Sequence, residues 1–247
     1  MINEPVQVVS EGFQLAWLEV TRRLAESYWE LRNVVVHIKR PGAMDIAFNE
    51  TVTAFARAQR LLTPKQVAYT IFPHKLYQRV GNASSLFSDY DRRLYPKIKR
   101  LQPKIANSWG NYFRRMTNYE SATGPVNQLQ NIIDAIQNRQ RLSSAAYTIV
   151  IQKPGTETVR PRGGPCLNYI AIQAEASWGG NRTIGLLAVY RNHEFLERAY
   201  GNYWGLCNLL IFLAAEVGGT PGPLTCVSSR AYVRGNKTAL NALIGRL

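Results

Sequence analysis

Carboxylates, cysteines and histidines are all scarce in this chain of 247 residues. Its 16 Asp and Glu are set against 30 Lys and Arg, so the formal net charge is +14. This balance excludes an acidic solvating protein and favours an anionic partner, namely a phosphorylated small molecule, a nucleic acid or a membrane surface. Three cysteines cannot form a disulfide framework, which indicates a reducing, cytoplasmic location. With three histidines and no CxxC pair, we expect no metal site.

Long apolar runs and several familiar motifs are also missing. The longest apolar stretch, residues 206–217, includes Asn208 and Glu216 and is shorter than the ~20 residues that a membrane-spanning helix needs. The first residues lack a basic start followed by an apolar run, so we expect neither export nor membrane insertion. No GxGxxG, P-loop or GxSxG occurs, so nothing supports a dinucleotide-binding protein, an NTPase or a serine hydrolase.

The hydrophobic pattern predicts one α+β domain over residues 1–247, built around a sheet packed by helices. Helices are predicted over residues 10–32, 49–61, 125–139, 194–217 and 237–246, with another beginning at Thr63-Pro64. Strands are predicted over residues 33–41, 148–152, 167–177, 183–191 and 223–233. Residues 75–108 are expected to form exposed loops with short helix, and residues 153–165 a loop.

Cys166 is a candidate nucleophile, because it opens an apolar strand just after Arg160 and Arg162. Nearby positive charge favours the thiolate over the thiol, and the thiolate is the reactive form. The alternative is that Cys166 is a small buried apolar residue. Cys207 and Cys226 lie inside apolar runs, which is typical of packing residues.

Arg191 and Asn202 are candidate ligand-binding residues. Arg191 follows a predicted strand, where a guanidinium group can bind a phosphate in forked geometry; a surface ion pair with Glu194 is the alternative. The Asn202 amide can pair with both a carbonyl and an N–H of a pyrimidine edge, or it can cap a helix or turn. The basic residues are dispersed and no nucleic-acid-binding motif accompanies them, so nucleic-acid binding is the less favoured interpretation.

In their order and spacing, these features resemble the thymidylate synthase and pyrimidine nucleotide hydroxymethylase family over residues 109–246. The segment SWGNYFRR is similar to the Tyr-Gly-x-x-Trp-Arg segment of that family. The other matching features are Pro165-Cys166 at the start of a strand, Arg191 after the returning strand, Asn202 eleven residues later, the turn at residues 218–223, and Tyr232 near the end of the last strand.

The resemblance implies a thymidylate synthase-like fold with a mixed, largely antiparallel sheet, and a homodimer joined through sheet faces. It implies that Cys166 adds to C6 of a pyrimidine nucleoside monophosphate, whose C5 then accepts a methyl or hydroxymethyl group. Arg191 would bind the phosphate, Asn202 the base and Tyr232 the ribose, and 5,10-methylenetetrahydrofolate would be the one-carbon donor. Asparagine at the base-reading position favours uracil over cytosine by the same resemblance.

The chain departs from the family at several positions. The arginine pair that reaches across the dimer is replaced by Ala145-Ala146, and Arg32 is the sole counterpart of the phosphate loop. The histidine before the ribose tyrosine is Arg230, residues 67–75 lack the catalytic glutamate, and no folate-closing tail follows the last helix. Candidates to replace the lost arginines are Arg160, Arg162 and Arg230. The alternative function is a divergent protein that binds nucleotide or nucleic acid without the folate-dependent reaction.

Overall fold

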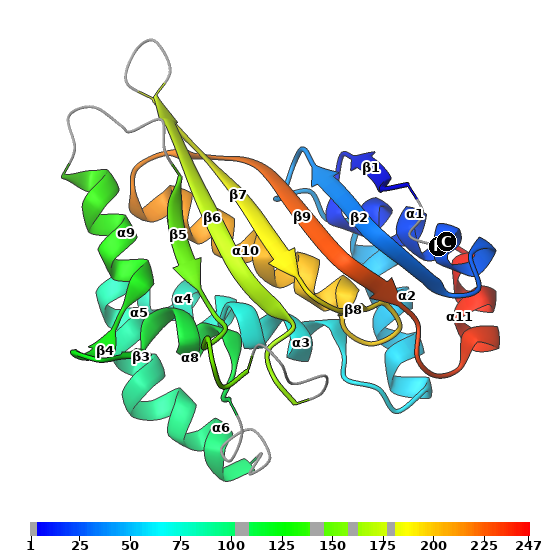
Figure 1. Ribbon diagram of the computed structural model, residues 1–247, viewed down its shortest axis with the longest axis horizontal. Helices are drawn as coiled ribbons and strands as arrows, with labels where there is room; N and C mark the ends of the chain where they lie inside the picture. Colours follow the sequence, from blue (N-terminus) through cyan, green and yellow to red (C-terminus); the bar gives the residue numbers. More distant parts are fainter. Residues whose placement is uncertain (1–3, 102–108, 139–145, 158–162, 177–180) are drawn as a thin grey trace.

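A seven-stranded mixed sheet forms the centre of the molecule in the computed structural model, which describes residues 4–101, 109–138, 146–157, 163–176 and 181–247 (Figure 1). The strand order is β1-β2-β9-β7-β6-β5, and the short β8 pairs with β9. The strands are β1 (Val6–Ser10), β2 (Glu30–Ile38), β5 (Tyr147–Val150), β6 (Leu167–Ala176), β7 (Arg182–Tyr190), β8 (His193–Glu194) and β9 (Thr220–Tyr232).

The pairings within this sheet run in both directions. β2 pairs with β9, β5 with β6 and β6 with β7 in antiparallel fashion. β1 pairs with β2, β7 with β9 and β8 with β9 in parallel. The predicted α+β architecture, a mixed sheet packed by helices, is confirmed. Of the six pairings among the described strands of this sheet, three are antiparallel and three are parallel.

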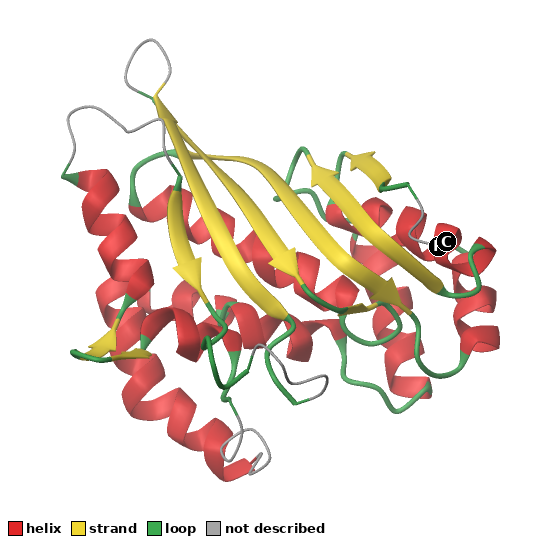
Figure 2. Ribbon diagram, in the orientation of Figure 1, coloured by secondary structure: helices red, strands yellow, loops and turns green. Residues whose placement is uncertain are grey.

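The principal helices cover one face of the sheet (Figure 2). The most central is α10 (Ala199–Glu216), which is apolar nearly all round and therefore buried on nearly all sides. None of the described helices combines the length and the apolar character that crossing a membrane requires. The other helical elements are α1 (Phe13–Glu26), α2 (Ile46–Ala58), α3 (Pro64–Ile71), α4 (His74–Val80), α5 (Ala83–Asp89), the π-helix η1 (Tyr90–Leu94), α6 (Tyr95–Leu101), α8 (Tyr112–Thr117), α9 (Gln128–Gln137) and α11 (Lys237–Ile244); β3 (Tyr119–Ser121) and β4 (Gly124–Val126) form a separate hairpin.

Three predictions of local structure were wrong. The helix predicted over residues 10–32 ends at Glu26, because Tyr28 and Trp29 take left-handed backbone conformations with φ of 52° and 67°. Arg32 therefore lies within β2 rather than at a helix–strand junction. Short helix was expected in residues 75–108 and residues 75–101 form four successive helical segments, but their apolar side chains enter the core instead of being exposed. The edge strand β1 was not predicted.

Helices α3 and α10 approach each other closely through two glycines. A Cβ at Gly201 would lie 2.5 Å from Val67 Cβ, and one at Gly205 would lie 2.8 Å from the Ala68 carbonyl oxygen. Only glycine leaves room for such an approach. A capping box between Thr63 and Gln66 begins α3. The cap thus fixes where α3 starts, and the two glycines allow α3 to pack close to α10.

Candidate active site

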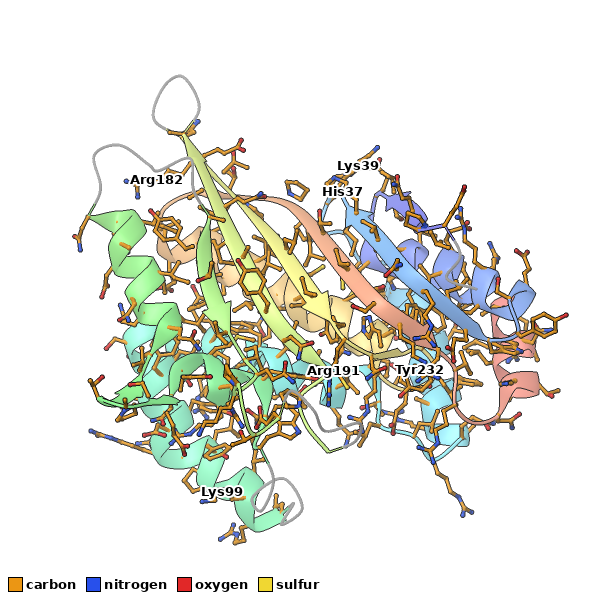
Figure 3. All side chains as sticks on the ribbon, viewed as in Figure 1. His37, Lys39, Lys99, Arg182, Arg191 and Tyr232 are labelled. Carbon is orange, nitrogen blue, oxygen red and sulfur yellow. The ribbon has the colours of Figure 1, made fainter. Side chains whose placement is uncertain are left out.

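The carboxyl ends of β7 and β9 meet the beginning of β6 at one edge of the sheet, because β7 and β9 are parallel and β6 is antiparallel to β7. Cys166 immediately precedes β6, Arg191 immediately follows β7, and Tyr232 ends β9. Figure 3 shows Arg191 and Tyr232 at this same edge. Three of the residues singled out from the sequence are thus brought together by strand order.

A cavity of about 710 Å³ opens beside this edge, within the ordinary size range of small-molecule sites. Cys166, Asn202 and Tyr232 line it. Its remaining described lining residues are Leu62, Lys65, Gln66, Val67, Tyr69, Thr70, Leu94, Ile98, Trp109, Gly110, Asn111, Tyr112, Gly164, Asn192, His193, Glu194 and Arg198. The cavity therefore lies between the sheet edge, the start of α10 and the segment from α3 to α8.

Cys166 is partly buried at the sheet edge, and its backbone is held by a tyrosine. The Tyr112 hydroxyl accepts hydrogen bonds from the backbone N–H groups of Cys166, at 3.3 Å, and Leu167, at 3.4 Å. Burial raises the pKa of the Cys166 thiol above its ordinary value, and the charges of Arg191 and Arg198 offset this only in part. Among the described residues it is Arg191 and Arg198 that favour the thiolate, and desolvation outweighs them; the expected contribution of Arg160 and Arg162 lies outside the described residues.

Cys166 should be the first of the three cysteines to react with iodoacetamide. Cys207 and Cys226 are fully buried, and burial raises the pKa of Cys226 to about 12. Since burial raises the pKa of the Cys166 thiol, its alkylation rate should level off at a higher pH than that of an exposed cysteine in a peptide. Peptide mapping of partially alkylated protein measures this order. Earlier labelling of Cys207 or Cys226 would contradict the structure.

Arg191 is tied to the segment that carries Cys166. Its backbone N–H donates to the Cys166 carbonyl oxygen at 2.9 Å and to Asn168 Oδ1 at 3.0 Å, and its Nε donates to the Pro165 carbonyl oxygen at 3.1 Å. Its guanidinium lies close to Gly164, where an added Cβ would be 3.1 Å from Nη2. Arg191 thus places a positive charge beside Cys166 without itself lining the cavity.

Asn202 lies in the first turn of α10 and is only 4% exposed. Its Nδ2 lies 3.1 Å from Nε2 of His193, a residue that the sequence analysis did not single out. Of its alternatives, a helix-capping role is not observed, since Arg198 is the N-cap residue of α10. Asn202 instead presents a polar group at the wall of the cavity.

Arg32 and Arg230 lie away from the cavity wall, on neighbouring strands. Both guanidinium groups pair with Glu30, at 2.7 Å for Arg32. The Arg230 guanidinium also lies 4.3 Å from the ring centroid of Tyr232, which links it indirectly to the site. Arg160, Arg162 and Ala145 lie outside the described residues.

Glu194 and Arg198 are cavity residues that the sequence analysis did not predict as functional. Glu194 is the one carboxylate among the described lining residues, and burial raises its pKa. It accepts backbone hydrogen bonds from Leu196 at 3.0 Å, Glu197 at 2.8 Å and Arg234 at 3.2 Å. Arg198 contributes a positive charge that lowers the pKa of the Cys166 thiol.

A buried ion pair lies next to the cavity wall. Arg115 Nη2 lies 2.6 Å from Glu157 Oε1, and both side chains are at most 10% exposed. Arg115 Nε also donates to the carbonyl oxygen of Trp109, a cavity-lining residue, at 2.8 Å. In the described part of the chain, no three His, Cys, Asp or Glu side chains are grouped so as to hold a metal ion.

Comparison with known proteins reveals a distant thymidylate synthase-like relationship. The chain is 27% identical over 122 residues to a protein of Methanococcoides burtonii and 29% identical over 124 residues to one of Methanosarcina mazei, both described as "Putative thymidylate synthase". Each match covers 49% of this chain, and the chain spans about half the length of these curated relatives. No protein-family model matches the chain.

Proposed function

We propose that this protein transfers a methyl or hydroxymethyl group to C5 of a pyrimidine nucleoside monophosphate through a covalent bond between Cys166 and C6. The observation that carries the proposal is the cavity at the sheet edge. Cys166, the Asn202 amide and the Tyr232 phenol line it together, and Arg191 lies beside the cysteine. The distant thymidylate synthase-like relatives support the same reaction class. The continuous core supports treating residues 1–247 as one domain.

The chemistry needs a nucleophile because the pyrimidine ring alone is a poor carbon nucleophile at C5. The Cys166 thiolate adds to C6, the electron pair of the C5–C6 double bond moves onto C5 and the C4 carbonyl, and C5 can then take up an electrophile. Loss of the C5 hydrogen as a proton and departure of the thiolate restore the double bond. Without a one-carbon electrophile, the same steps exchange the C5 hydrogen with water.

Asn202, Tyr232 and Arg191 would orient the nucleotide. The Asn202 amide would pair with the base edge, and the Tyr232 hydroxyl would bind the ribose. Arg191, whose backbone N–H is hydrogen-bonded to the Cys166 carbonyl oxygen, would bind the phosphate and so align the base with the Cys166 sulfur. We also retain Arg32, Arg162 and Arg230 as candidate phosphate contacts, although Arg32 and Arg230 pair with Glu30 in the structure.

Arg191→Ala should weaken binding of a pyrimidine nucleoside monophosphate about tenfold or more. A charge-assisted hydrogen bond from arginine to phosphate contributes about 1.5–3 kcal/mol, and the corresponding nucleoside lacks that bond. Isothermal titration calorimetry with nucleotide and nucleoside measures the difference. Arg93→Ala is the matched control, because that side chain is 77% exposed and pairs with Asp89, whereas Arg191 contacts the segment that carries Cys166. Equal affinity of wild-type protein for nucleotide and nucleoside would contradict the role of Arg191.

The cavity residues fit a reduced folate as the one-carbon donor. One wall is apolar and aromatic and is formed by Leu62, Val67, Leu94, Ile98 and Trp109, against which a flat ring system can pack. A carboxylate has about four acceptor positions, so Glu194 can accept from a ring N–H besides its three backbone donors. When bound there, 5,10-methylenetetrahydrofolate would supply the one-carbon unit at the oxidation level of formaldehyde; water would complete a hydroxymethyl product, and a hydride from the reduced folate would be needed for a methyl product.

The sheet face opposite the helices is proposed as a homodimer interface. Val35, Val227, Val189, Tyr169 and Val150 occupy successive strands in register, and none is fully buried. No described helix covers this face in Figure 2. Analytical ultracentrifugation at micromolar concentration should therefore detect a dimer. Val189→Glu should dissociate it by placing a charge at the interface, and a wild-type monomer would contradict the interface.

Tritium release from C5 tests the proposed reaction. The substrates are UMP, dUMP, CMP and dCMP labelled at C5, each with and without 5,10-methylenetetrahydrofolate. We expect slow release from one base without the donor and faster release with it. Binding of a nucleotide with no release under any condition would favour the alternative, a nucleotide-binding protein without this chemistry.

A further inference from the structure

His193 is enclosed beside Asn202 by three aromatic rings. His193 is buried, with only 1% of its surface exposed. The Tyr190 ring stacks on it in parallel at 4.0 Å between centroids, and Phe195 and Tyr203 contact it edge-on at 5.2 and 5.3 Å. Burial lowers the pKa of His193 to about 3, so the imidazole is neutral at physiological pH.

The two ring nitrogens of His193 contact different polar groups. Nε2 lies 3.1 Å from Asn202 Nδ2, and Nδ1 lies 3.0 Å from Ser228 Oγ. An amide nitrogen only donates and a neutral imidazole has one donor and one acceptor. Nε2 is therefore the acceptor, and Nδ1 carries the proton and donates a hydrogen bond to Ser228 Oγ. The Ser228 hydroxyl also hydrogen-bonds Cys226 and lowers the pKa of that thiol, so the hydrogen-bond network of His193 continues into the core.

The hydrogen-bond network of His193 restricts the Asn202 amide, which faces the cavity. One N–H of Asn202 is used by His193, which leaves the second N–H and Oδ1 at the cavity wall. Rotating the amide by half a turn would place Oδ1 against the Nε2 lone pair, and two acceptors would then face each other in a buried site. Two acceptors facing each other in a buried site are unfavourable. As long as Ser228 accepts from Nδ1 and so keeps the proton on that nitrogen, the donor and acceptor positions of Asn202 are locked.

We propose that His193 and Ser228 are positioning residues that lock the Asn202 amide in one orientation and so set the discrimination between uracil and cytosine. The inference rests on the proposed function of the cavity. Uracil presents an N3–H donor and an O4 acceptor, whereas cytosine presents an N3 acceptor and an amino donor. These patterns are reversed, so an amide held in one orientation matches one base, and an amide free to rotate can match both.

The test compares the affinities of UMP and CMP, and of their deoxy forms, by calorimetry. Wild-type protein should prefer uracil. His193→Phe keeps an aromatic ring but removes the acceptor, and the uracil-to-cytosine affinity ratio should fall about tenfold, the size of one neutral hydrogen bond. Ser228→Ala releases the tautomer with a smaller change in packing, and the ratio should fall in the same direction.

Two variants serve as matched controls. Ser228→Thr retains the hydroxyl and should retain the wild-type ratio. Tyr190→Phe keeps the ring stacked on His193 and removes a hydroxyl that has no partner among the described residues, so it should also retain the ratio. A purely structural role for this cluster would instead change both affinities together and leave their ratio constant, which would overturn the proposal. Thermal unfolding of each variant confirms that it is folded.

The tautomer gives a readout that needs no nucleotide. Long-range ¹H–¹⁵N correlation spectra of the three histidines should show His193 neutral, with its proton on Nδ1. A proton on Nε2 would overturn the inference while leaving the proposed function intact. Failure of all four nucleotides to bind would overturn the proposed function and this inference together, whereas selective binding that is unchanged in His193→Phe and Ser228→Ala would overturn the inference alone.

Discussion

Cys166→Ser should reduce C5 hydrogen exchange by at least about a thousandfold while the protein stays folded and still binds nucleotide. A serine hydroxyl is similar in size to a thiol but far less ionised at neutral pH, so it is a much weaker nucleophile. Deuterium incorporation at C5, followed by NMR in heavy water, measures the loss. Calorimetry with the same nucleotide should show affinity within a few fold of the wild type.

The matched control for this change is Cys207→Ala. Cys207 is fully buried on α10 and does not line the cavity, so its replacement should leave exchange nearly unchanged. If Cys166→Ser retains full exchange, then Cys166 is not the nucleophile. The cavity would then support only nucleotide binding.

Glu157→Ala should destabilise the protein by about 3–5 kcal/mol, the largest stability effect that we expect from a single polar substitution here. Removal of the carboxylate leaves the Arg115 guanidinium buried without its counter-charge, which lies at 2.6 Å in the wild type. Because Arg115 also binds the Trp109 carbonyl oxygen, the variant should weaken nucleotide binding as well. Urea unfolding followed by circular dichroism measures the change.

An exposed ion pair provides the comparison. Glu120 pairs with Lys153, but its side chain is 78% exposed, and Glu120→Ala should change stability by less than about 1 kcal/mol. Similar losses for Glu157→Ala and Glu120→Ala would mean that the Arg115–Glu157 pair does not support the fold as its burial indicates.

Cys166 and Arg191 could be singled out from the sequence because each lies next to a predicted strand with readable apolar alternation. Tyr232 was singled out by the family resemblance alone, and Asn202 by the chemistry of its amide, to which the resemblance added the spacing from Arg191. A parallel pairing with one antiparallel neighbour brings the ends of the strands near Cys166, Arg191 and Tyr232 together. The fold class was predictable on the same grounds, since the strong strands and helices have the clearest periodicity.

The wall contributed by α3, η1 and α6 was not predictable, because it depends on long-range packing. The polar segment that starts at residue 75 was expected to be exposed, yet Leu86 and Tyr90 are buried in the core. The pairing of Glu30 with Arg230 joins residues 200 positions apart, which no local pattern reveals. The role of His193 was missed for the same reason, because its partner Ser228 comes from β9.

The covalent bond between Cys166 and the pyrimidine is tested most directly by mass spectrometry of quenched enzyme. The preferred nucleotide is used as its 5-fluoro analogue together with 5,10-methylenetetrahydrofolate. Once C5 has accepted the one-carbon unit it carries fluorine in place of hydrogen, and because fluorine cannot leave as a cation the adduct persists. The intact mass should rise by the masses of the nucleotide and the one-carbon donor together. Peptide mapping should locate the increase at Cys166. An adduct at another residue, or no adduct under conditions where the unsubstituted nucleotide exchanges its C5 hydrogen, would contradict this mechanism.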